Sequence, residues 1–502
     1  MINEIKTIES KITLRMAAMI IEKNGRALLT AFMTVFFMIV TAAVPAVFAQ
    51  SGEMPLTASK EALALFKQGL EKAENLEDPG TLFDQAVQKD PNFAFGYLYA
   101  GQNNPEFLKN LEKAVSLADK ASPGEREWIL AVQDQNNGNQ AGRLAHLEKL
   151  LKLHPRDKRA HAQMGQYYRN IGDEPTALRY FSESIKIDKK YAPAYNNIGY
   201  SNMALGKYAD AEAAFQRYIK LIPNNPNPYD SYAELLMKTG KYDESVKQYN
   251  MALAKDQTFI ASYRGMGNNY VYKGDYAKSR AIYQMMYDKA TNDGSRHQAL
   301  SSTMNAWIAE GNIEKAMEVN DRRIALAEKI GDVQTMWNLH NLAGFVNVES
   351  GNLDAAAKHF EMAAKLASDP SLAAATAANR KFNAGLQRSR YLAARGQFDE
   401  ARSELDAARS APAARNVNQE YNLNQAAGYL ELKQKNYAKA SEFFAKANPN
   451  DPFVWYYRAV ASEGAGDTKS AAELYRRIAD WNRLDTTGYA LVRSRAMAKL
   501  QK

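Results

Sequence analysis

Among its 502 residues the sequence contains no cysteine. This absence excludes disulfide frameworks, thiolate catalysis, cysteine zinc sites and lipid attachment at an N-terminal cysteine. Histidine is scarce as well, and none of the six histidines forms an H-E-x-x-H or other pair at ligand spacing. They are His146, His154, His161, His297, His340 and His359. We therefore expect no metal site.

Motifs for nucleotide binding and hydrolysis are also missing, because neither G-x-x-x-x-G-K-[ST] nor G-x-S-x-G occurs. Gly265 and Gly267 resemble the start of a glycine-rich nucleotide-binding motif. They lie inside a predicted helix, follow no strand and lack the third glycine, so they are interpreted as packing residues. No pair of carboxylates stands apart as acid and base. We expect no enzyme activity and no cofactor, and keep a cryptic envelope enzyme only as a remote alternative.

Long apolar runs are absent except at residues 27–49, which carry no charge, follow Lys23 and Arg26, and contain Pro45. This pattern predicts a signal peptide over residues 1–49, cleaved before Gln50. An uncleaved N-terminal anchor is the alternative, because 23 apolar residues can span a bilayer. The positive flank directs the following chain across the membrane. We expect an exported protein, periplasmic or in the cell envelope, with secretion or membrane anchoring as variants. Any membrane contact is expected only through this segment.

Positive charge is concentrated near the C-terminus. The chain has a formal net charge of +8, and residues 376–502 hold 21 Lys and Arg against 13 Asp and Glu. Scattered basic residues on helices are usually solvated, but such an asymmetry can also attract acidic partners. Attachment of this basic C-terminal quarter to an acidic envelope surface is therefore an alternative function.

A repeat of 34 residues runs through the middle of the chain, where turn glycines recur at that interval. They are Gly138, Gly172, Gly206, Gly240 and Gly274, and a second series of small residues precedes them by seven positions, namely Gly165, Gly199, Ala233 and Gly267. Beyond residue 290 the turn positions are Gly311, Gly351, Gly396, Lys435 and Gly466, so the period loosens while an alanine still follows five residues later. No stretch shows sustained strand alternation, and the sequence predicts helices throughout.

The unit at residues 192–225, APAYNNIGYSNMALGKYADAEAAFQRYIKLIPNN, resembles the tetratricopeptide consensus. Small residues such as Gly199 allow two helices to approach closely, and Phe215 and Tyr208 fill the space beside them. Gly206 provides the turn, and Pro223 ends the second helix. The resemblance implies an all-α, right-handed superhelical solenoid of roughly nine to eleven helical hairpins.

Five regions follow from this pattern. After the signal peptide at 1–49 come degenerate hairpins at 50–123, five regular repeats at 124–291, irregular hairpins at 292–478 and a C-terminal capping helix at 479–502. The stretches 366–380 and 409–419 are predicted to connect hairpins in the irregular region.

In tetratricopeptide proteins the first helix of each repeat lines a concave groove, and the resemblance transfers the groove positions to this chain. They are Trp128, Arg159, Gln166, Arg169, Asn196, Tyr200, Asp230, Glu234, Lys238, Arg264, Asn268 and Tyr272. This polar lining with some aromatic residues suits an extended peptide or a partner helix. Arg264 and Asn268 match only the first pair of the family's clamp for C-terminal carboxylates, so binding of chaperone tails is not supported.

The 28 tyrosines could stack on bases, but most occupy packing positions of the repeat, among them Tyr208, Tyr242, Tyr276, Tyr249 and Tyr283. We therefore expect no nucleic-acid binding. The sequence predicts an exported scaffold that binds protein or peptide partners through its concave groove.

Overall fold

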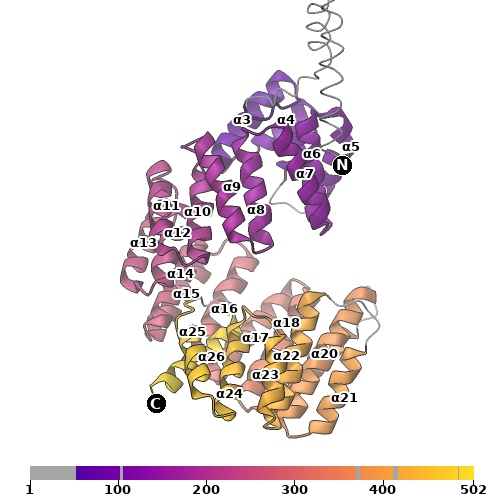
Figure 1. Cartoon of the computed structure of the whole chain (residues 1–502), viewed down its shortest axis with the longest axis vertical. Coiled ribbons are helices and arrows are strands. Elements are labelled where there is room, and N and C mark those ends of the chain that lie inside the picture. Colours follow the sequence, from indigo (N-terminus) through magenta and orange to yellow (C-terminus); the bar gives the residue numbers. More distant parts are fainter. Residues whose placement is uncertain (1–51, 102–105, 369–373, 411–415, 484–485, 502) are drawn as a thin grey trace, which may run out of the picture. The chain divides into compact units, whose positions relative to one another are not determined.

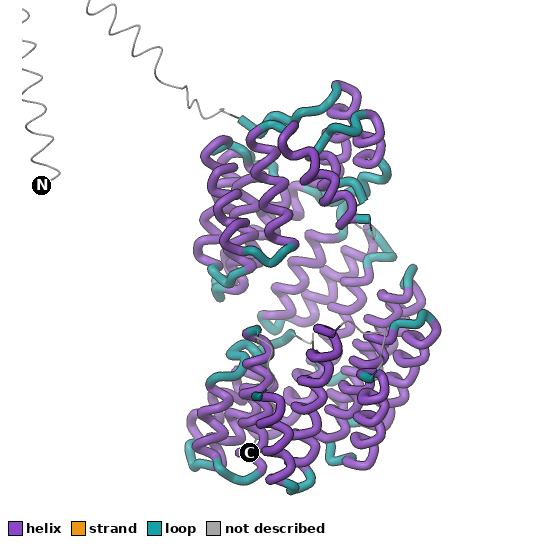
Figure 2. The backbone as a smooth tube through the Cα atoms, turned by 90° about the vertical axis from the view of Figure 1, so that its right-hand side faces the viewer, coloured by secondary structure: helices purple, strands orange, loops and turns teal. Residues whose placement is uncertain are grey.

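The computed structural model describes residues 52–101, 106–368, 374–410, 416–483 and 486–501, so the predicted signal peptide lies outside the described residues. Within these ranges the chain forms helices and no strand (Figure 2). None of the described helices combines the length and apolar character that crossing a membrane requires. The all-α solenoid of helical hairpins predicted from the repeats is confirmed.

The chain divides into two compact units, with boundaries between residues 66 and 67, 80 and 81, and 167 and 168. Unit 1 comprises residues 52–66 and 81–167 of the described chain, and unit 2 comprises 67–80 and 168–501. The helices of unit 1, counting the shared ones, are α3 (Lys60–Glu74), α4 (Leu82–Lys89), η1 (Phe95–Leu98), α5 (Phe107–Leu117), η2 (Ala118–Lys120), α6 (Pro123–Asn136), α7 (Gln140–Leu153) and α8 (Lys158–Asn170).

Unit 1 is organised around an aromatic core. The buried ring of Phe66 lies 5.0–5.9 Å from the rings of Phe83, Phe93, Phe95 and Tyr99. Edge-to-face contacts of this kind add to the free energy gained by burying apolar area. The shortened hairpins before residue 123 are therefore held together by tilted and edge-to-face ring contacts.

Unit 2 contains most of the hairpins (Figure 1). Its first eight complete helices are α9 (Glu174–Ile187), α10 (Ala192–Ala204), α11 (Tyr208–Leu221), α12 (Asn227–Lys238), α13 (Tyr242–Lys255), α14 (Ile260–Tyr272), α15 (Tyr276–Lys289) and α16 (Asp293–Glu310). The remaining helices are α17 (Ile313–Lys329), α18 (Val333–Glu349), α19 (Leu353–Ala367), α20 (Ala374–Ala394), α21 (Phe398–Arg409), α22 (Val417–Lys433), α23 (Tyr437–Ala445), α24 (Pro452–Gly464), α25 (Thr468–Ala479) and α26 (Thr487–Leu500).

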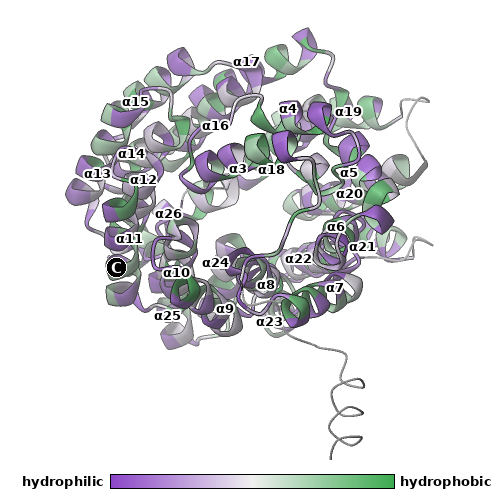
Figure 3. Ribbon diagram, turned by 90° about the horizontal axis from the view of Figure 1, so that it is seen from above, coloured by the Kyte–Doolittle hydropathy of each residue, from purple (hydrophilic) through white to green (hydrophobic). Residues whose placement is uncertain are grey.

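Helices α10 to α25 pair into hairpins, and the first helix of each hairpin touches the first helix of the next in the series α10, α12, α14 and α16, and again from α18 to α24. These even-numbered helices form an inner layer, while each odd-numbered helix packs between two of them. Hydrophobic and hydrophilic residues recur in patches along the helices (Figure 3), as expected for elements with one buried side.

Turn residues adopt the backbone conformation that the sequence predicts. Every predicted turn position has a positive φ, from 66° at Lys435 to 92° at Gly311. The longer period after residue 290 arises from longer helices, because α16 has 18 residues and α20 has 21, compared with 13 in α10 and α14. Helix α20 begins at Ala374, so the predicted connection at 366–380 is too long.

The close approach of paired helices depends on a glycine that faces an aromatic ring sixteen residues later. A Cβ added to the glycine would stand closer than 3 Å to ring carbons. Four hairpins use this pair, at Gly199–Phe215, Gly267–Tyr283, Gly344–Phe360 and Gly428–Phe444. The contact therefore continues into the irregular hairpins. The predicted packing of Tyr208 is wrong, however, because this side chain is 41% exposed, whereas the equivalent Tyr242 and Tyr276 reach the main core of unit 2.

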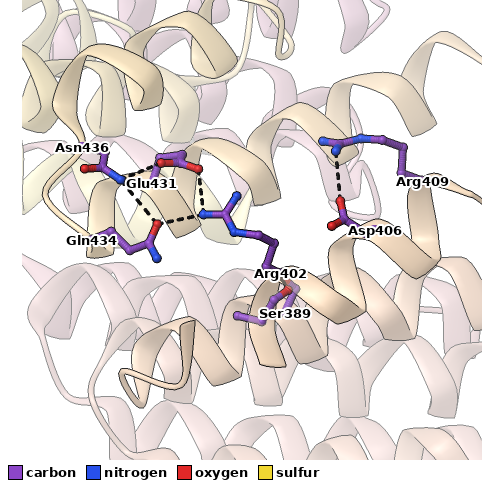
Figure 4. Close-up of polar contacts among 8 residues, drawn as sticks. Ser389, Arg402, Asp406, Arg409, Glu431, Gln434 and Asn436 are labelled. Carbon is purple, nitrogen blue, oxygen red and sulfur yellow. Dashed lines mark hydrogen bonds and ion pairs between the residues drawn. The ribbon is translucent and has the colours of Figure 1, made fainter. Parts of the chain in front are cut away.

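A polar brace holds the turn at Lys435, the one hairpin turn of the described repeats that lacks a turn glycine. The buried Glu431 accepts hydrogen bonds from Arg402 of α21 at 3.1 Å and from Asn436 at 2.8 Å, and Arg402 also donates to Gln434 (Figure 4). These bonds connect the second helix of one hairpin to the turn of the next.

The last helix does more than cover the final hairpin. Helix α26 packs against α25 and α24, and it also packs against α16 of the inner layer. Thr487 donates a hydrogen bond to Asn305 of α16 at 2.9 Å, and Arg495 lies 3.5 Å from Glu349 of α18. Helix α26 therefore lies on the inner layer of unit 2.

Candidate functional site

Residues 34 apart occupy equivalent positions on the inner helices α10, α12 and α14, which contact one another. The repeat thus brings predicted groove residues side by side in two rows. One row is Tyr200, Glu234 and Asn268, and the other is Asn196, Asp230 and Arg264. We refer to these six residues as the inner-face cluster.

Hydrogen bonds cross from one repeat to the next within this cluster. The hydroxyl of Tyr200 donates to Glu234 Oε2 at 2.9 Å and lies 3.2 Å from Ser231 Oγ. Ser262 of α14 donates to Asp230 Oδ1 at 2.7 Å. The spacing of 34 residues predicts the meeting of Tyr200 with Glu234, whereas the two serines carry no motif that would single them out.

Burial changes the proton affinity of the two carboxyl groups. Asp230 is 5% exposed, and burial followed by the charge of Glu234 raises its pKa to about 7. Burial also raises the pKa of Glu234, although its hydrogen bond from Tyr200 and the charges of Arg264 and Arg483 oppose the change. Neither carboxylate forms an ion pair with another described residue. Burial in the inner-face cluster therefore favours the protonated form of Asp230 up to about neutral pH.

Polar atoms without hydrogen-bond partners lie within the cluster and beside it. The Oδ1 atom of Asn196 and the hydroxyl of Tyr249 are buried and unpaired among the described residues. Burial and the nearby charges of Asp230 and Glu234 raise the pKa of Tyr249 well above its ordinary value, so its hydroxyl stays protonated. A buried polar atom without a partner costs free energy that a bound ligand can recover.

Arg169 lies beside the cluster at the end of α8. Its guanidinium donates to Asn197 Oδ1 at 2.7 Å and lies 5.5 Å from the ring centroid of Tyr200. Arg169 thus braces the exposed side of the Tyr200 ring through a cation–π contact.

Three predicted groove residues are engaged by other parts of unit 2. Lys238 donates to the carbonyl oxygen of Trp481 at 2.6 Å, and burial lowers its pKa. Asn268 accepts a hydrogen bond from Tyr283 at 2.6 Å. Tyr272 is 7% exposed and lies under the guanidinium of Arg493. Lys238 and Tyr272 therefore hold the chain's own C-terminal segment, a role for which sequence spacing carries no signal.

The other three predicted groove residues belong to unit 1. Trp128 is 3% exposed, and its ring lies edge-on to Phe95 at 5.3 Å. Arg159 is 6% exposed, and its guanidinium lies 3.5 Å from Asp157 and from Glu53. Gln166 is half-buried. Trp128 and Arg159 thus contribute to the packed interior of unit 1 because the degenerate hairpins beside them cover these positions.

Part of the positive charge of the basic C-terminal quarter lies inside the fold. Arg380, Arg390 and Arg493 are at most 9% exposed. Arg390 pairs with the buried Glu349 at 3.2 Å. These arginines stabilise the interior of unit 2 and are not available to an external acidic surface. Among the residues that the structure describes, no three His, Asp or Glu side chains are grouped to hold a metal ion.

Models of the tetratricopeptide repeat match residues 202–267, and also 163–226 and 426–485. Among curated proteins, the chain is 24% identical over 130 residues to "Superkiller complex protein 3" of Homo sapiens, covering 25% of this chain and 8% of that protein. It is 22% identical over 148 residues to "Hsp70-Hsp90 organizing protein" of Triticum aestivum, covering 28% of this chain and 25% of that protein. The matches thus span a quarter or less of these relatives.

Several solved structures are similar to part of this chain. "PilW, widely conserved type IV pilus biogenesis factor" is 15% identical with a TM-score of 0.36, covering 43% of this chain and 98% of that one. A tetratricopeptide repeat protein from Parabacteroides merdae is 11% identical with a TM-score of 0.33, covering 61% and 98%. The MamA protein is 21% identical with a TM-score of 0.30, covering 33% and 91%.

Proposed function

We propose that this protein, whose helical hairpins are tetratricopeptide repeats, is an exported scaffold that binds a protein or peptide partner on the inner face of α10, α12 and α14. One relative has a name that describes the organisation of other proteins, which supports a partner of this class. No catalytic role is part of the proposal.

The observation that carries the proposal is the inner-face cluster. It combines two buried carboxyl groups that lack an ion pair with unpaired polar atoms on Asn196 and Tyr249. Interiors of proteins normally satisfy such groups, and sites that leave them unsatisfied are commonly binding sites.

The chemistry of the cluster suits a partner that contributes hydrogen-bond donors. Backbone N–H groups of an extended peptide, or an amide side chain, can donate to Glu234. Arg264, exposed beside both carboxyl groups, can meet an acidic side chain of the same peptide. The partner is therefore expected to be a mixed polar segment rather than an apolar helix.

Affinity capture from the native host tests the proposal with the full chain as bait. The triple variant Tyr200→Ala, Glu234→Ala and Arg264→Ala is expected to lose a specific protein that the wild type captures, because three neighbouring contacts are removed at once. Quantitative mass spectrometry measures the captured amount, and a loss of at least tenfold is expected.

A matched control changes three exposed residues on the second helices α11 and α13, namely Lys220→Ala, Glu244→Ala and Lys247→Ala. The control is expected to retain capture, and both variants should keep the helical circular dichroism of the wild type. Equal capture by the triple variant and the wild type would place the partner elsewhere.

Export is the second part of the proposal and depends on the apolar segment 27–49. The expected mature N-terminus is Gln50, because Val47-Phe48-Ala49 forms a small-residue cleavage site. N-terminal sequencing of protein purified from the native host measures it. Protein found intact and inside the cytoplasm would contradict export.

A further inference from the structure

A cavity of roughly 290 Å³ opens between α26 and the inner helices of unit 2. Val271 and Tyr272 at the end of α14, Ala309 of α16 and Met497 of α26 form much of its wall, and Arg493 of α26 lines it as well. The cavity exists only because α26 packs on the inner layer, so it is not part of the repeat framework. It is separate from the side chains of α10 and α12 in the inner-face cluster.

Polar side chains that line the cavity are Lys273, Ser494, Gln501 and Arg493, and Arg493 has no acidic partner among the described residues. Arg493 is 9% exposed, and no carboxylate forms an ion pair with it among the described residues. The Nε atom of Arg493 has no hydrogen-bond partner. The Arg493 side chain also forms a hydrogen bond with the hydroxyl of Tyr489. Its guanidinium lies 4.9 Å from the ring centroid of Tyr272. Buried charges are normally paired, so this arginine departs from the rule.

The surroundings explain how the empty cavity tolerates a cation. The π face of Tyr272 attracts the guanidinium, and the carbonyl end of α14 favours positive charge. The acidic residues next in sequence to the lining residues Gly274 and Ala309 are engaged elsewhere, because Asp275 accepts the backbone N–H of Lys278 and Glu310 pairs with Arg280 at 2.6 Å. No side chain of the described protein therefore neutralises Arg493.

From this geometry we propose that the cavity between α14, α16 and α26 binds a carboxylate whose apolar body packs against Val271, Ala309 and Met497, with Arg493 as the anionic group's partner. A guanidinium presents parallel N–H donors that match the two oxygens of a carboxylate. The volume is at the small end of ligand pockets, which fits one terminal residue of a peptide or a small aliphatic acid.

The test titrates the full chain by isothermal calorimetry with three probes. They are a tetrapeptide ending in leucine with a free carboxylate, the same tetrapeptide as an amide, and 4-methylpentanoate. Saturable binding of the free-acid peptide or of 4-methylpentanoate, without binding of the amide, is expected. Binding of the free-acid peptide alone identifies a peptide terminus as the source of the carboxylate, whereas binding of 4-methylpentanoate identifies a small molecule. Equal binding of acid and amide peptides, or no saturable heat with any probe, overturns the proposal.

Two variants act on different properties of the cavity. Arg493→Gln removes the charge, and Met497→Trp fills the space while leaving the arginine in place. Each is expected to weaken binding of the carboxylate probe at least tenfold, while the exposed control Arg476→Gln on α25 leaves it unchanged. Unchanged affinity in Met497→Trp would overturn the proposal even if Arg493→Gln failed to fold. The triple variant of the inner-face cluster is expected to keep probe binding, so failure of the scaffold function is distinguishable from failure of this site.

Discussion

Within each hairpin, one residue decides how closely the two helices approach. Gly199 and Gly267 leave room for the rings of Phe215 and Tyr283 because they lack a Cβ. The cost of a helical glycine, about 1 kcal/mol relative to alanine, is offset by the large apolar area that the buried ring removes from water. At these positions the packing of the hairpin, and not helix propensity, therefore determines that glycine is the most stabilising residue.

A pair of glycine substitutions separates packing from propensity. Gly199→Ala is expected to lower the free energy of unfolding by roughly 1–3 kcal/mol, because the new Cβ meets the Phe215 ring. Gly385→Ala in α20 is expected to raise it by up to about 1 kcal/mol, because a Cβ there meets only Ala408 Cβ at 3.6 Å and Glu404 O at 3.7 Å. Urea denaturation measures both, and the same sign for the two variants would contradict the packing argument.

The raised pKa of Asp230 predicts how the free energy of unfolding depends on pH. Its folded-state pKa of about 7 exceeds the ordinary value, so the folded chain holds an additional proton between about pH 4 and pH 7. The contribution to stability is complete at low pH and is lost as the pH rises through 7. Asp230→Asn, which keeps an acceptor for Ser262, is expected to be more stable than wild type at pH 8 by roughly 1–4 kcal/mol.

The urea midpoint at pH 5 and pH 8 measures this effect. The charges of Glu234 and Arg264 act on Asp230, and Asp230 acts in turn on the hydroxyls of Tyr200 and Tyr249. Asp243→Asn is the control of opposite sign, because the hydrogen bond from Lys273 lowers the pKa of Asp243. An identical pH dependence for Asp230→Asn and wild type would refute the assignment of this proton to Asp230.

Among elements, the hairpin turns show how strictly the backbone controls the repeat. Nine of the ten predicted turn positions are glycines with positive φ, and Lys435 adopts the same conformation with φ of 66°. A lysine in this region is strained because its Cβ approaches the backbone. The hydrogen bonds from Arg402 and Asn436 to Glu431 help to hold the turn against that strain.

Replacing Lys435 by glycine is expected to stabilise the protein by about 0.5–1 kcal/mol, because the strain disappears at the price of greater freedom in the unfolded chain. Lys439→Gly, at an exposed position inside α23, is the matched control and is expected to destabilise by about 1 kcal/mol. Thermal unfolding monitored by circular dichroism compares them. A loss of stability in Lys435→Gly would mean that the lysine side chain contributes a contact that outweighs the strain.

At the scale of the whole molecule, contacts between residues far apart in the chain connect the helices of unit 2. The buried Glu349 at the end of α18 accepts hydrogen bonds from Arg390 of α20, Arg495 of α26 and the hydroxyl of Tyr457 of α24. Four helices thus meet at one carboxylate. Removing one donor from such a buried carboxylate leaves its negative charge less compensated, which is costly.

Arg495→Ala is expected to weaken the docking of α26 without unfolding the repeats. Amide hydrogen exchange in α26 should become at least tenfold faster, because this side chain attaches α26 to Glu349 of the inner layer. Exchange in α10 to α13 should stay unchanged. Lys499→Ala on the same helix breaks only an exposed pair with Glu463 and is expected to change little. Uniform acceleration across unit 2 would show that α26 is required for folding of the whole unit.

The repeat period, the turn positions and the pairing of Gly199 with Phe215 follow from local sequence, since each depends on residues within about one repeat of one another. The same spacing brings Tyr200 to Glu234, and that part of the inner-face cluster was predictable. The packing of α26 on the inner layer was not, because Lys238 meets Trp481 across 243 residues and no periodicity links them. Burial of Trp128 and Arg159 likewise depends on degenerate hairpins whose packing only the tertiary structure decides. Local spacing therefore determined the hairpins, while the distant contacts that cover or leave open their inner face were decided by the folded chain.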